Sequence, residues 1–267
     1  LLEVQKDTFY GIMSPSMIKI NTVIDNILLS YYFAGEKGKK SILFLHGWRS
    51  ESLLWEKAML TLAGAGFSLY ALDLPGFGYS EYPEETFGVS EYADIVKKFI
   101  LKFDLTPVIL VGHSFGGRIS IKLAAQDPEL VSKVVLVDSA GFIDTSLAKK
   151  IKGSIAKILK PVFKIPGLKS LKPKLYNLMG AGDYLATPQL TSSYIKIVRE
   201  DLSSDMEQID KPTLIFWGDR DKTTPVDYAK RMNNLIKGSQ LEIVPGGHFS
   251  FLDSPIQFQN SLLKFVK

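Results

Sequence analysis

Gly112-His113-Ser114-Phe115-Gly116-Gly117 directly follows the apolar run Val108 to Val111 and leads into a segment of helical periodicity, Gly116 to Ala125. A serine on so tight a turn between a strand and a helix is held above the sheet, with its Oγ accessible and its backbone strained. Glycines beside it avoid the collisions that larger residues would cause. The stretch therefore predicts a strand, a sharp turn and a helix, with Ser114 as a nucleophile.

On both sides of this turn, short apolar runs alternate with segments of helical period. The runs expected to form strands are 41–45, 68–72, 108–111, 134–137, 213–217 and 241–244. The segments expected to form helices are 52–62, 90–103, 116–125, 226–236 and 255–266. Such alternation is typical of βαβ units. We predict an α/β fold with a mostly parallel central sheet flanked by helices, and an antiparallel pair of strands from Met17 to Phe33 at its edge.

The alternation stops after Gly141 for about 65 residues and returns at Thr213, so one core is interrupted by an insertion. The length alone allows either one core with an insertion or two domains, because α/β folds of about 250 residues often form a single unit. The expected division is a core of residues 1–142 and 207–267 with an inserted segment of residues 143–206.

The composition excludes several kinds of site. The chain has 267 residues, of which 46% are hydrophobic and 22% charged, as in ordinary globular proteins that bury a large core. It has no cysteine and three histidines, which excludes disulfides, a thiolate metal site and a cysteine nucleophile. The net charge of +4 is mild, and no nucleic-acid partner is expected. Serine chemistry at Ser114 requires neither a cofactor nor a metal.

A serine hydroxyl is a weak nucleophile until a base accepts its proton, and three histidines are available. His113 adjoins Ser114 on the same turn and should point elsewhere. His46 ends a predicted strand before Gly47 and is expected to fix that loop. His248, which lies in a loop after the last predicted strand, is therefore the expected general base.

The base needs a carboxylate that holds its tautomer and stabilises the imidazolium. Trp217-Gly218-Asp219-Arg220-Asp221 follows the penultimate predicted strand and offers two aspartates. We expect Asp221, which lies deeper in the loop, to be the acid. Asp219 is the close rival, and Asp138, at the end of another strand, is a weaker alternative. All three keep the order serine, aspartate, histidine along the chain.

A tetrahedral intermediate needs preorganised donors for its oxygen, and backbone N–H groups provide them without reorganisation. The N–H of Phe115, directly after the nucleophile, is one candidate. The second is the N–H of Trp48, in the loop that follows the strand expected at 41–45, where Gly47 allows close approach. The Trp48 side chain would serve equally well as a core aromatic, which leaves the role of its main chain intact.

Together these segments resemble the signature segments of the α/β-hydrolase superfamily. In chain order they are His46-Gly47-Trp48, Asp73-Leu74-Pro75-Gly76-Phe77-Gly78-Tyr79-Ser80, the turn around Ser114, Trp217 to Asp221, and Gly247-His248. The resemblance implies that fold, a serine-aspartate-histidine triad and a structural role for Asp73 in a loop beside the site. It does not specify the substrate, since similar enzymes include esterases, lipases, carbon-carbon bond hydrolases, thioesterases and cofactor-free haloperoxidases.

The resemblance also implies that the insertion is a helical cap, or lid, over the active site. Nine lysines between Lys149 and Lys174 interleave with apolar residues in a basic amphipathic pattern. Such a pattern is compatible with contact to an anionic membrane surface, but a cap helix with one face on the pocket and its lysines in water is the commoner explanation. We therefore do not favour a membrane partner.

These observations lead us to expect hydrolysis of a carboxylic ester of a small or medium apolar molecule, through an acyl-enzyme on Ser114. The alternatives are a carbon-carbon bond hydrolase with the same triad and a small-molecule receptor with weak hydrolase activity. No stretch approaches the run of about 18 apolar residues that a membrane-spanning helix needs. A cytoplasmic location is expected, although the start at Leu1 leaves open that a leader was removed. The sequence does not indicate the oligomeric state.

Overall fold

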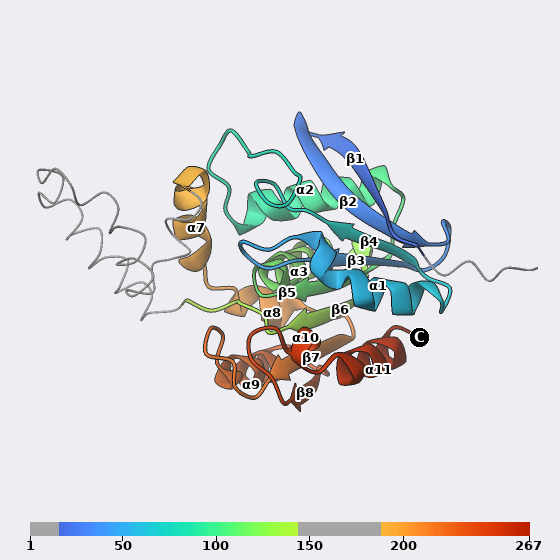
Figure 1. The fold of residues 1–267 in the computed structure, drawn as a ribbon. Coiled ribbons are helices and arrows are strands. Elements are labelled where there is room, and N and C mark those ends of the chain that lie inside the picture. Colours follow the sequence, from blue (N-terminus) through green and yellow to red (C-terminus); the bar gives the residue numbers. More distant parts are fainter. Residues whose placement is uncertain (1–15, 144–187) are drawn as a thin grey trace, which may run out of the picture.

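The computed structural model describes residues 16–143 and 188–267, which form an eight-stranded sheet with helices on both faces (Figure 1). Its strands are β1 (Ile18–Ile24), β2 (Ile27–Gly35), β3 (Ser41–Leu45), β4 (Ser68–Leu72), β5 (Val108–His113), β6 (Val131–Val137), β7 (Thr213–Gly218) and β8 (Gln240–Val244). Their spatial order is β1-β2-β4-β3-β5-β6-β7-β8. Strands β3 to β8 are parallel, while β2 is antiparallel to both β1 and β4. The α/β fold with an antiparallel pair at one edge is thus confirmed.

The helices divide between the two faces of the sheet. The 3-10 turn η1 (Ser52–Trp55), α1 (Glu56–Ala63), α10 (Ser250–Asp253) and α11 (Pro255–Val266) cover one face. The other face carries α2 (Val89–Lys102), α3 (Phe115–Gln126), α8 (Ser203–Gln208) and α9 (Val226–Leu235). Three further elements are the 3-10 turns η2 (Pro128–Leu130) and η5 (Pro188–Leu190) and the helix α7 (Thr191–Val198).

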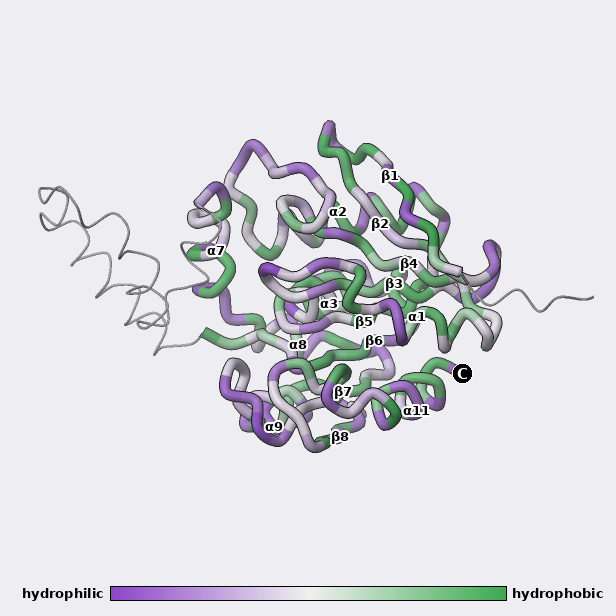
Figure 2. Tube along the Cα trace, viewed as in Figure 1, coloured by the Kyte–Doolittle hydropathy of each residue, from purple (hydrophilic) through white to green (hydrophobic). Residues whose placement is uncertain are grey.

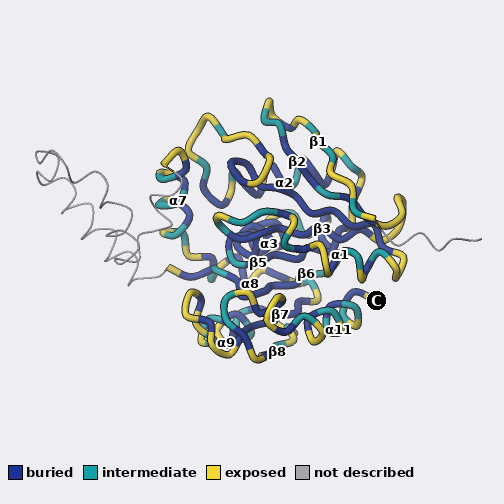
Figure 3. Tube along the Cα trace, in the orientation of Figure 1, coloured by how far each residue is buried: buried dark blue, intermediate teal, exposed yellow. Residues whose placement is uncertain are grey.

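The central strands are buried on both faces, which explains why their sequences are continuously apolar. In β3, Ile42 and Phe44 pack with the side chains of α1 and α11, whereas Leu43 and Leu45 pack with those of α2 and α3. Figures 2 and 3 show β3, β5 and β6 as hydrophobic and buried at the centre of the molecule. A parallel sheet needs this double cover, because both of its faces must leave water.

Parallel strands place their carboxyl ends at one edge of the sheet, and ligand sites of open α/β sheets form there. The turns that leave β3, β5, β6, β7 and β8 therefore meet at this edge. The candidate residues of the sequence follow these strands as His46 to Trp48, Ser114, Asp138, Asp219 with Asp221, and His248.

Residues 144–187, which include the lysine-rich stretch and most of the expected cap, lie outside the described residues. The described end of the expected insertion packs on the core. Leu202 and Met206 are fully buried together with side chains of α3 and α9, and the N–H of Leu202 donates to Gly141 O at 2.9 Å. Among the residues that the structure describes, no helix is both long and apolar enough to cross a membrane. The boundaries of the cap stay a prediction.

Helix α3 crosses the end of β3 at Gly116. The N–H of Gly116 donates to His46 O at 3.1 Å, and a Cβ added to Gly116 would lie 2.3 Å from Leu45 O. The atom that an added Cβ would meet, Leu45 O, belongs to the backbone of the sheet, so it cannot move aside as a flexible side chain could. The position of the nucleophile turn therefore depends on this close contact.

We expect Gly116→Ala to lower the free energy of unfolding by roughly 1 to 3 kcal/mol or more, as overpacking of a dense interior does. Urea denaturation followed by circular dichroism measures the loss. Gly64→Ala is the matched control, because the nearest atom to its added Cβ is Thr61 O at 3.7 Å and its φ of −66° suits alanine. Equal stability of the two variants would contradict the proposed contact.

Candidate active site

Ser114 occupies the strained turn between β5 and α3. Its φ of 50° and ψ of −107° lie outside the regions that L-residues ordinarily adopt, and such strain persists only where the surroundings fix it. Here the N–H of Ser114 donates to Val137 O at 3.1 Å, and its carbonyl accepts from the N–H of Ala140 at 3.0 Å. A Cβ at Gly112 would lie 2.4 Å from Gly116 O, so the turn is too tight for a larger residue. The serine hydroxyl is thereby held at the carboxyl edge of the sheet.

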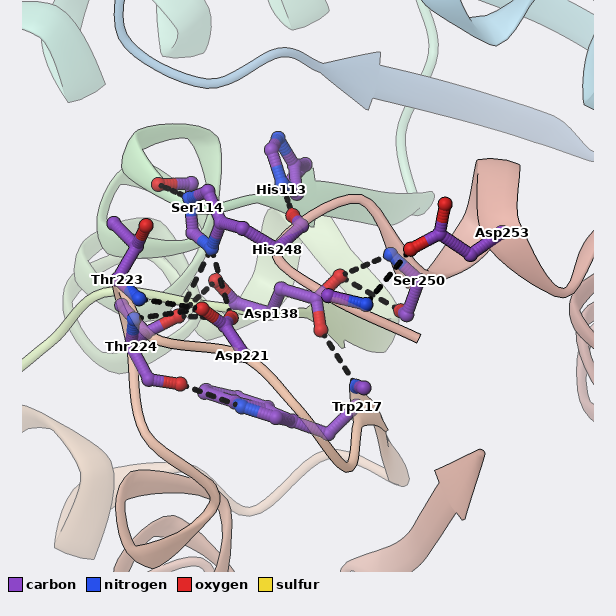
Figure 4. Close-up of polar contacts among 12 residues, drawn as sticks. His113, Ser114, Asp138, Trp217, Asp221, Thr223, Thr224, His248, Ser250 and Asp253 are labelled. Atoms are coloured by element: carbon purple, nitrogen blue, oxygen red, sulfur yellow. Dashed lines mark hydrogen bonds and ion pairs between the residues drawn. The ribbon is translucent and has the colours of Figure 1, made fainter. Parts of the chain in front are cut away.

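The structure brings Ser114, His248 and Asp221 together from three separate loops (Figure 4). Ser114 Oγ lies 3.0 Å from His248 Nε2, and His248 Nδ1 lies 2.8 Å from Asp221 Oδ2. An N–H at Nδ1 that donates to the carboxylate leaves the lone pair of Nε2 facing the hydroxyl, which fixes the tautomer from the hydrogen-bond network. The geometry allows the imidazole to take the proton of Ser114.

Asp221 is buried but held in its ionised form. Burial raises its pKa, yet hydrogen bonding to His248, the charge of His248 and hydrogen bonds from Thr224 outweigh this effect, so the pKa lies below its ordinary value. The N–H groups of Thr223 and Thr224 both donate to Oδ1, at 2.7 and 3.0 Å. Asp221 is therefore a carboxylate with a negative charge available to the imidazole.

Thr224 is a site residue that the sequence reasoning missed. Its Oγ1 lies 2.7 Å from Asp221 Oδ2 and 3.0 Å from Asp138 O, and its single hydroxyl proton serves one of them at a time. A signal was present in Asp221-Lys222-Thr223-Thr224, because an aspartate that accepts the N–H two residues on forms an Asx-turn. Thr224 thus positions the carboxylate, and its Oγ1 also lies 3.2 Å from His248 Nδ1.

The rival aspartates have other partners. Asp219 Oδ1 accepts the N–H of Gly246 at 2.9 Å and lies 3.4 Å from Arg220 Nε, so it shapes the loop that precedes His248. None of the hydrogen bonds that the structure gives Asp219 involves the imidazole. Asp221, and not Asp219, is the aspartate whose carboxylate the structure places against His248.

Asp138 joins the two loops that carry the acid and the histidine. Its Oδ1 accepts the N–H of Gly218 at 2.9 Å, and its Oδ2 accepts both the N–H of Ser250 at 2.9 Å and the Oγ of Ser250 at 2.7 Å. Burial raises its pKa to about 6 against the opposing effect of these donors. Although Asp138 was an alternative for the acid, its carboxylate faces the backbone of both loops and not His248.

The other two histidines contact the backbone of neighbouring loops. Burial and the nearby His248 lower the pKa of His113 to about 3, so this ring is neutral, and its Nε2 lies 2.7 Å from His248 O. His46 Nδ1 lies 2.7 Å from Gly47 O, and its Nε2 accepts the N–H of Leu74 at 3.0 Å. Burial lowers the pKa of His46 as well. Neither ring is placed to accept the proton of Ser114.

Two backbone N–H groups lie beside Ser114 at the pocket. Phe115 is the first residue of α3, and the first N–H groups of a helix have no partner within it. Trp48 lies in the loop after β3 and lines the same pocket. Neither N–H has an acceptor among the described residues. The Trp48 ring packs against Phe77 and Phe115, with centroids 4.9 and 5.4 Å away, so its side chain is also part of the wall.

Asp73 ties the neighbouring loop to η1, in line with the structural role implied by the resemblance. Its Oδ1 accepts the N–H and Oγ of Ser52 at 2.8 and 2.5 Å, and its Oδ2 accepts the N–H of Tyr79 at 3.0 Å. Gly78 passes so close that an added Cβ would lie 2.3 Å from the carboxylate. Both carboxylate oxygens of Asp73 therefore accept hydrogen bonds from within the protein.

The described residues form a pocket of about 400 Å³ over Ser114 and His248. Aromatic and aliphatic side chains supply most of its wall: Trp48, Phe115, Phe142, Tyr194, Ile197, Val198, Tyr228 and Phe249. Its charged lining residues within the described chain are Arg49 and Arg118, and no aspartate or glutamate lines it there. Residues 16–143 and 188–267 contain no group of three or more histidine, aspartate or glutamate side chains that could hold a metal ion.

Comparison with known proteins agrees with this architecture. The model of the alpha/beta hydrolase fold family matches residues 40–156 and 186–255. An uncharacterized protein of Mycobacterium tuberculosis is 31% identical over 256 residues, covering 85% of this chain and 75% of that protein. A 2-(acetamidomethylene)succinate hydrolase of Mesorhizobium japonicum is 29% identical over 250 residues, covering 86% of this chain and 90% of that protein.

Among solved structures, an esterase from Exiguobacterium antarcticum matches with a TM-score of 0.71 and 25% identity, covering 91% of this chain and 97% of that one. The family match spans both parts of the described core, and the mostly parallel sheet and the turn at Ser114 are those the sequence motifs predicted. The chain therefore belongs to the alpha/beta hydrolase fold family and is a hydrolase.

Proposed function

We propose that the chain hydrolyses a carboxylic ester of a small or medium molecule with a largely apolar body, through an acyl-enzyme on Ser114. The observation that carries the proposal is the chain of contacts from Ser114 Oγ through the His248 imidazole to the Asp221 carboxylate, at 3.0 and 2.8 Å. A nucleophile, a base and an orienting acid in hydrogen-bond reach are the requirements for nucleophilic acyl transfer.

In the first half-reaction, Ser114 Oγ attacks the ester carbonyl carbon while His248 Nε2 accepts the serine proton. The resulting oxyanion receives hydrogen bonds from the backbone N–H groups of Phe115 and Trp48. Donors that are already in place cost no reorganisation as the charge develops. When the intermediate collapses, the C–O bond to the alcohol breaks and His248 returns the proton to the departing oxygen.

In the second half-reaction, water replaces the alcohol. His248 takes a proton from the water, the hydroxide adds to the acyl carbon, and the acid leaves as Ser114 regains its proton. Asp221 stays ionised throughout and stabilises the imidazolium, which agrees with the direction of its pKa shift. The sum is one ester and one water converted to one acid and one alcohol.

The dimensions of the pocket support a small or medium substrate. Its volume of about 400 Å³ is near the lower end of the range of roughly 300 to 1,000 Å³ that is typical of small-molecule sites. The apolar wall suits a hydrocarbon body. The similar structure from Exiguobacterium antarcticum is described as an esterase, which is consistent with ester cleavage.

Ser114→Ala should abolish hydrolysis of 4-nitrophenyl esters, because it removes the atom that forms the acyl-enzyme. The expected fall in kcat is on the order of 10⁶, the loss seen when a triad nucleophile is removed. Spectrophotometric assay of acetate to decanoate esters measures the loss and the preferred acyl length together. A fluorophosphonate should label the wild-type chain at Ser114, as mass spectrometry of the peptides would show.

Two outcomes would overturn this function. If Ser114→Ala retained turnover, the nucleophile would lie elsewhere. If the wild-type chain bound the esters without turnover and resisted the fluorophosphonate, a receptor role would replace the hydrolase.

Asp221→Asn should reduce kcat for these esters by roughly 10⁴, because an amide keeps the shape but favours the wrong imidazole tautomer. Asp219→Asn is the matched control: it makes the same chemical change two residues away, where the side chain contacts Gly246 and Arg220. We expect it to change kcat only a few-fold. Circular dichroism would verify that both variants fold, and the opposite ranking of the two would reverse the assignment of the acid.

A further inference from the structure

Arg118 is a charged residue in the pocket whose role the proposed reaction does not explain. It lies on α3, four residues after Ser114, so the two residues lie about one helical turn apart. Its side chain lines the pocket, and only 3% of the residue is exposed. Arginine is almost never buried to this degree unless it is paired with a negative charge.

The hydrogen bonds of Arg118 use less than half of its donors. One terminal nitrogen donates to Glu200 O and the other to Phe142 O, both at 2.8 Å. A guanidinium carries five N–H groups, so these two bonds leave three without a partner among the described residues. Both acceptors are neutral carbonyls, which satisfy hydrogen bonds but do not neutralise the charge.

The nearest carboxylates are engaged elsewhere. Glu200 Oε1 pairs with Lys122 Nζ at 2.9 Å. Asp201 accepts the N–H of Ser203 at 2.9 Å and that of Ile143 at 3.4 Å. Within the described chain, no carboxylate lies within 4.0 Å of the guanidinium of Arg118. Arg118, which lines the pocket, thus has no carboxylate within ion-pair distance of its guanidinium among the described residues.

The pKa of Arg118 reflects the same imbalance. Burial lowers it to about 10, and the attraction of Glu200 and Asp201 offsets only part of this effect. The side chain is still protonated at neutral pH. A buried cation without a paired anion is costly, and an anion that enters the pocket would relieve that cost.

We infer that Arg118 binds a carboxylate on the substrate, so that the preferred ester is an anion whose second carboxylate pairs with this guanidinium while Ser114 attacks the ester carbonyl. The inference rests on the proposed function and narrows its substrate class to half-esters of dicarboxylic acids and similar molecules. A singly charged carboxylate balances one guanidinium, whereas a dianionic phosphate would leave a negative charge buried and unpaired. The planar fork of arginine also matches a carboxylate in geometry.

A purely structural role makes a different prediction. Phe142 and Glu200 stand on either side of residues 144–187, so Arg118 also links two separate parts of the chain. If that were its whole purpose, loss of Arg118 would lower stability and would affect charged and neutral substrates alike. Selectivity between matched substrates therefore separates the two roles.

The test uses pairs of 4-nitrophenyl esters that differ by one group. The monoesters of succinate, glutarate and adipate are compared with butanoate, pentanoate and hexanoate, in which a methyl group replaces the carboxylate. We expect the wild-type chain to have the higher kcat/KM for the acid in at least one pair, after subtraction of spontaneous hydrolysis. Arg118→Met should lower that value by roughly 10- to 100-fold and change the neutral partner only a few-fold. Arg118→Lys, which keeps the charge, should retain part of the preference.

Arg199→Met is the matched control for charge. Arg199 directly follows α7 as an exposed residue outside the pocket, so its removal changes the net charge equally without touching the site. We expect it to leave the preference for the acid within a few-fold of the wild-type value. A loss of preference in Arg199→Met as large as in Arg118→Met would assign the effect to the general field of the protein and overturn the inference.

The remaining outcomes separate this inference from the proposed function. Hydrolysis with no preference for the acid in any pair, or an equal loss for both members in Arg118→Met, would overturn the role of Arg118 and leave the esterase in place. Calorimetric titration with adipate and its neutral diamide covers the opposite case. In that case no ester is cleaved, but adipate binds more tightly than the diamide, and Arg118→Met removes the difference in affinity. This result would support the carboxylate-binding role of Arg118 and contradict the proposed ester hydrolysis. Should Arg118→Met not fold, the wild-type preference and Arg118→Lys decide alone.

Discussion

The close passage of α3 over the end of β3 is the constraint on which the site depends. Gly116 lies so close to the backbone of Leu45 that no side chain fits between them. Ser114 adopts a strained backbone conformation in the turn that joins β5 to α3. That strain is sustained by hydrogen bonds to Val137 and Ala140, which belong to the next strand of the sheet and the turn after it. The nucleophile is therefore positioned by contacts with β3 and β6 as well as by its own turn.

Asp138 holds in place the two loops that carry Asp221 and His248. The acid and the histidine reside on loops after different strands, and one buried carboxylate accepts hydrogen bonds from Gly218 and Ser250, which flank those loops. Its elevated pKa shows the cost of keeping that group buried. Asp138 thus holds together the loops that carry Asp221 and His248, while Thr224 orients the Asp221 carboxylate directly.

The sequence predicted the sheet because a parallel sheet must be covered on both faces, and the apolar runs report that burial directly. It predicted Ser114, His248 and Asp221 because few residues were available for each role. It ranked Asp138 below Asp221 as the acid, but it could not show that Asp138 joins two loops, and it did not find Arg118. The hydrogen-bond partners of Asp138 lie 80 and 112 residues away, and those of Arg118 lie 24 and 82 residues away. Such contacts leave no local pattern, whereas Thr224 left one in the Asx-turn after Asp221.

The charge of Arg118 is difficult to explain by stability alone. Two backbone carbonyls can be satisfied by the neutral amide of a glutamine, which would avoid the cost of removing a cation from water. Lys122, one turn further along α3, shows the usual solution for a buried cation, because it pairs with both Glu200 and Asp205. Arg118 lies on the same helix, but it lines the pocket and has no carboxylate paired with it among the described residues. The difference between these two cations is that one has its anion within the fold, while the other is open to an anion that enters with the substrate.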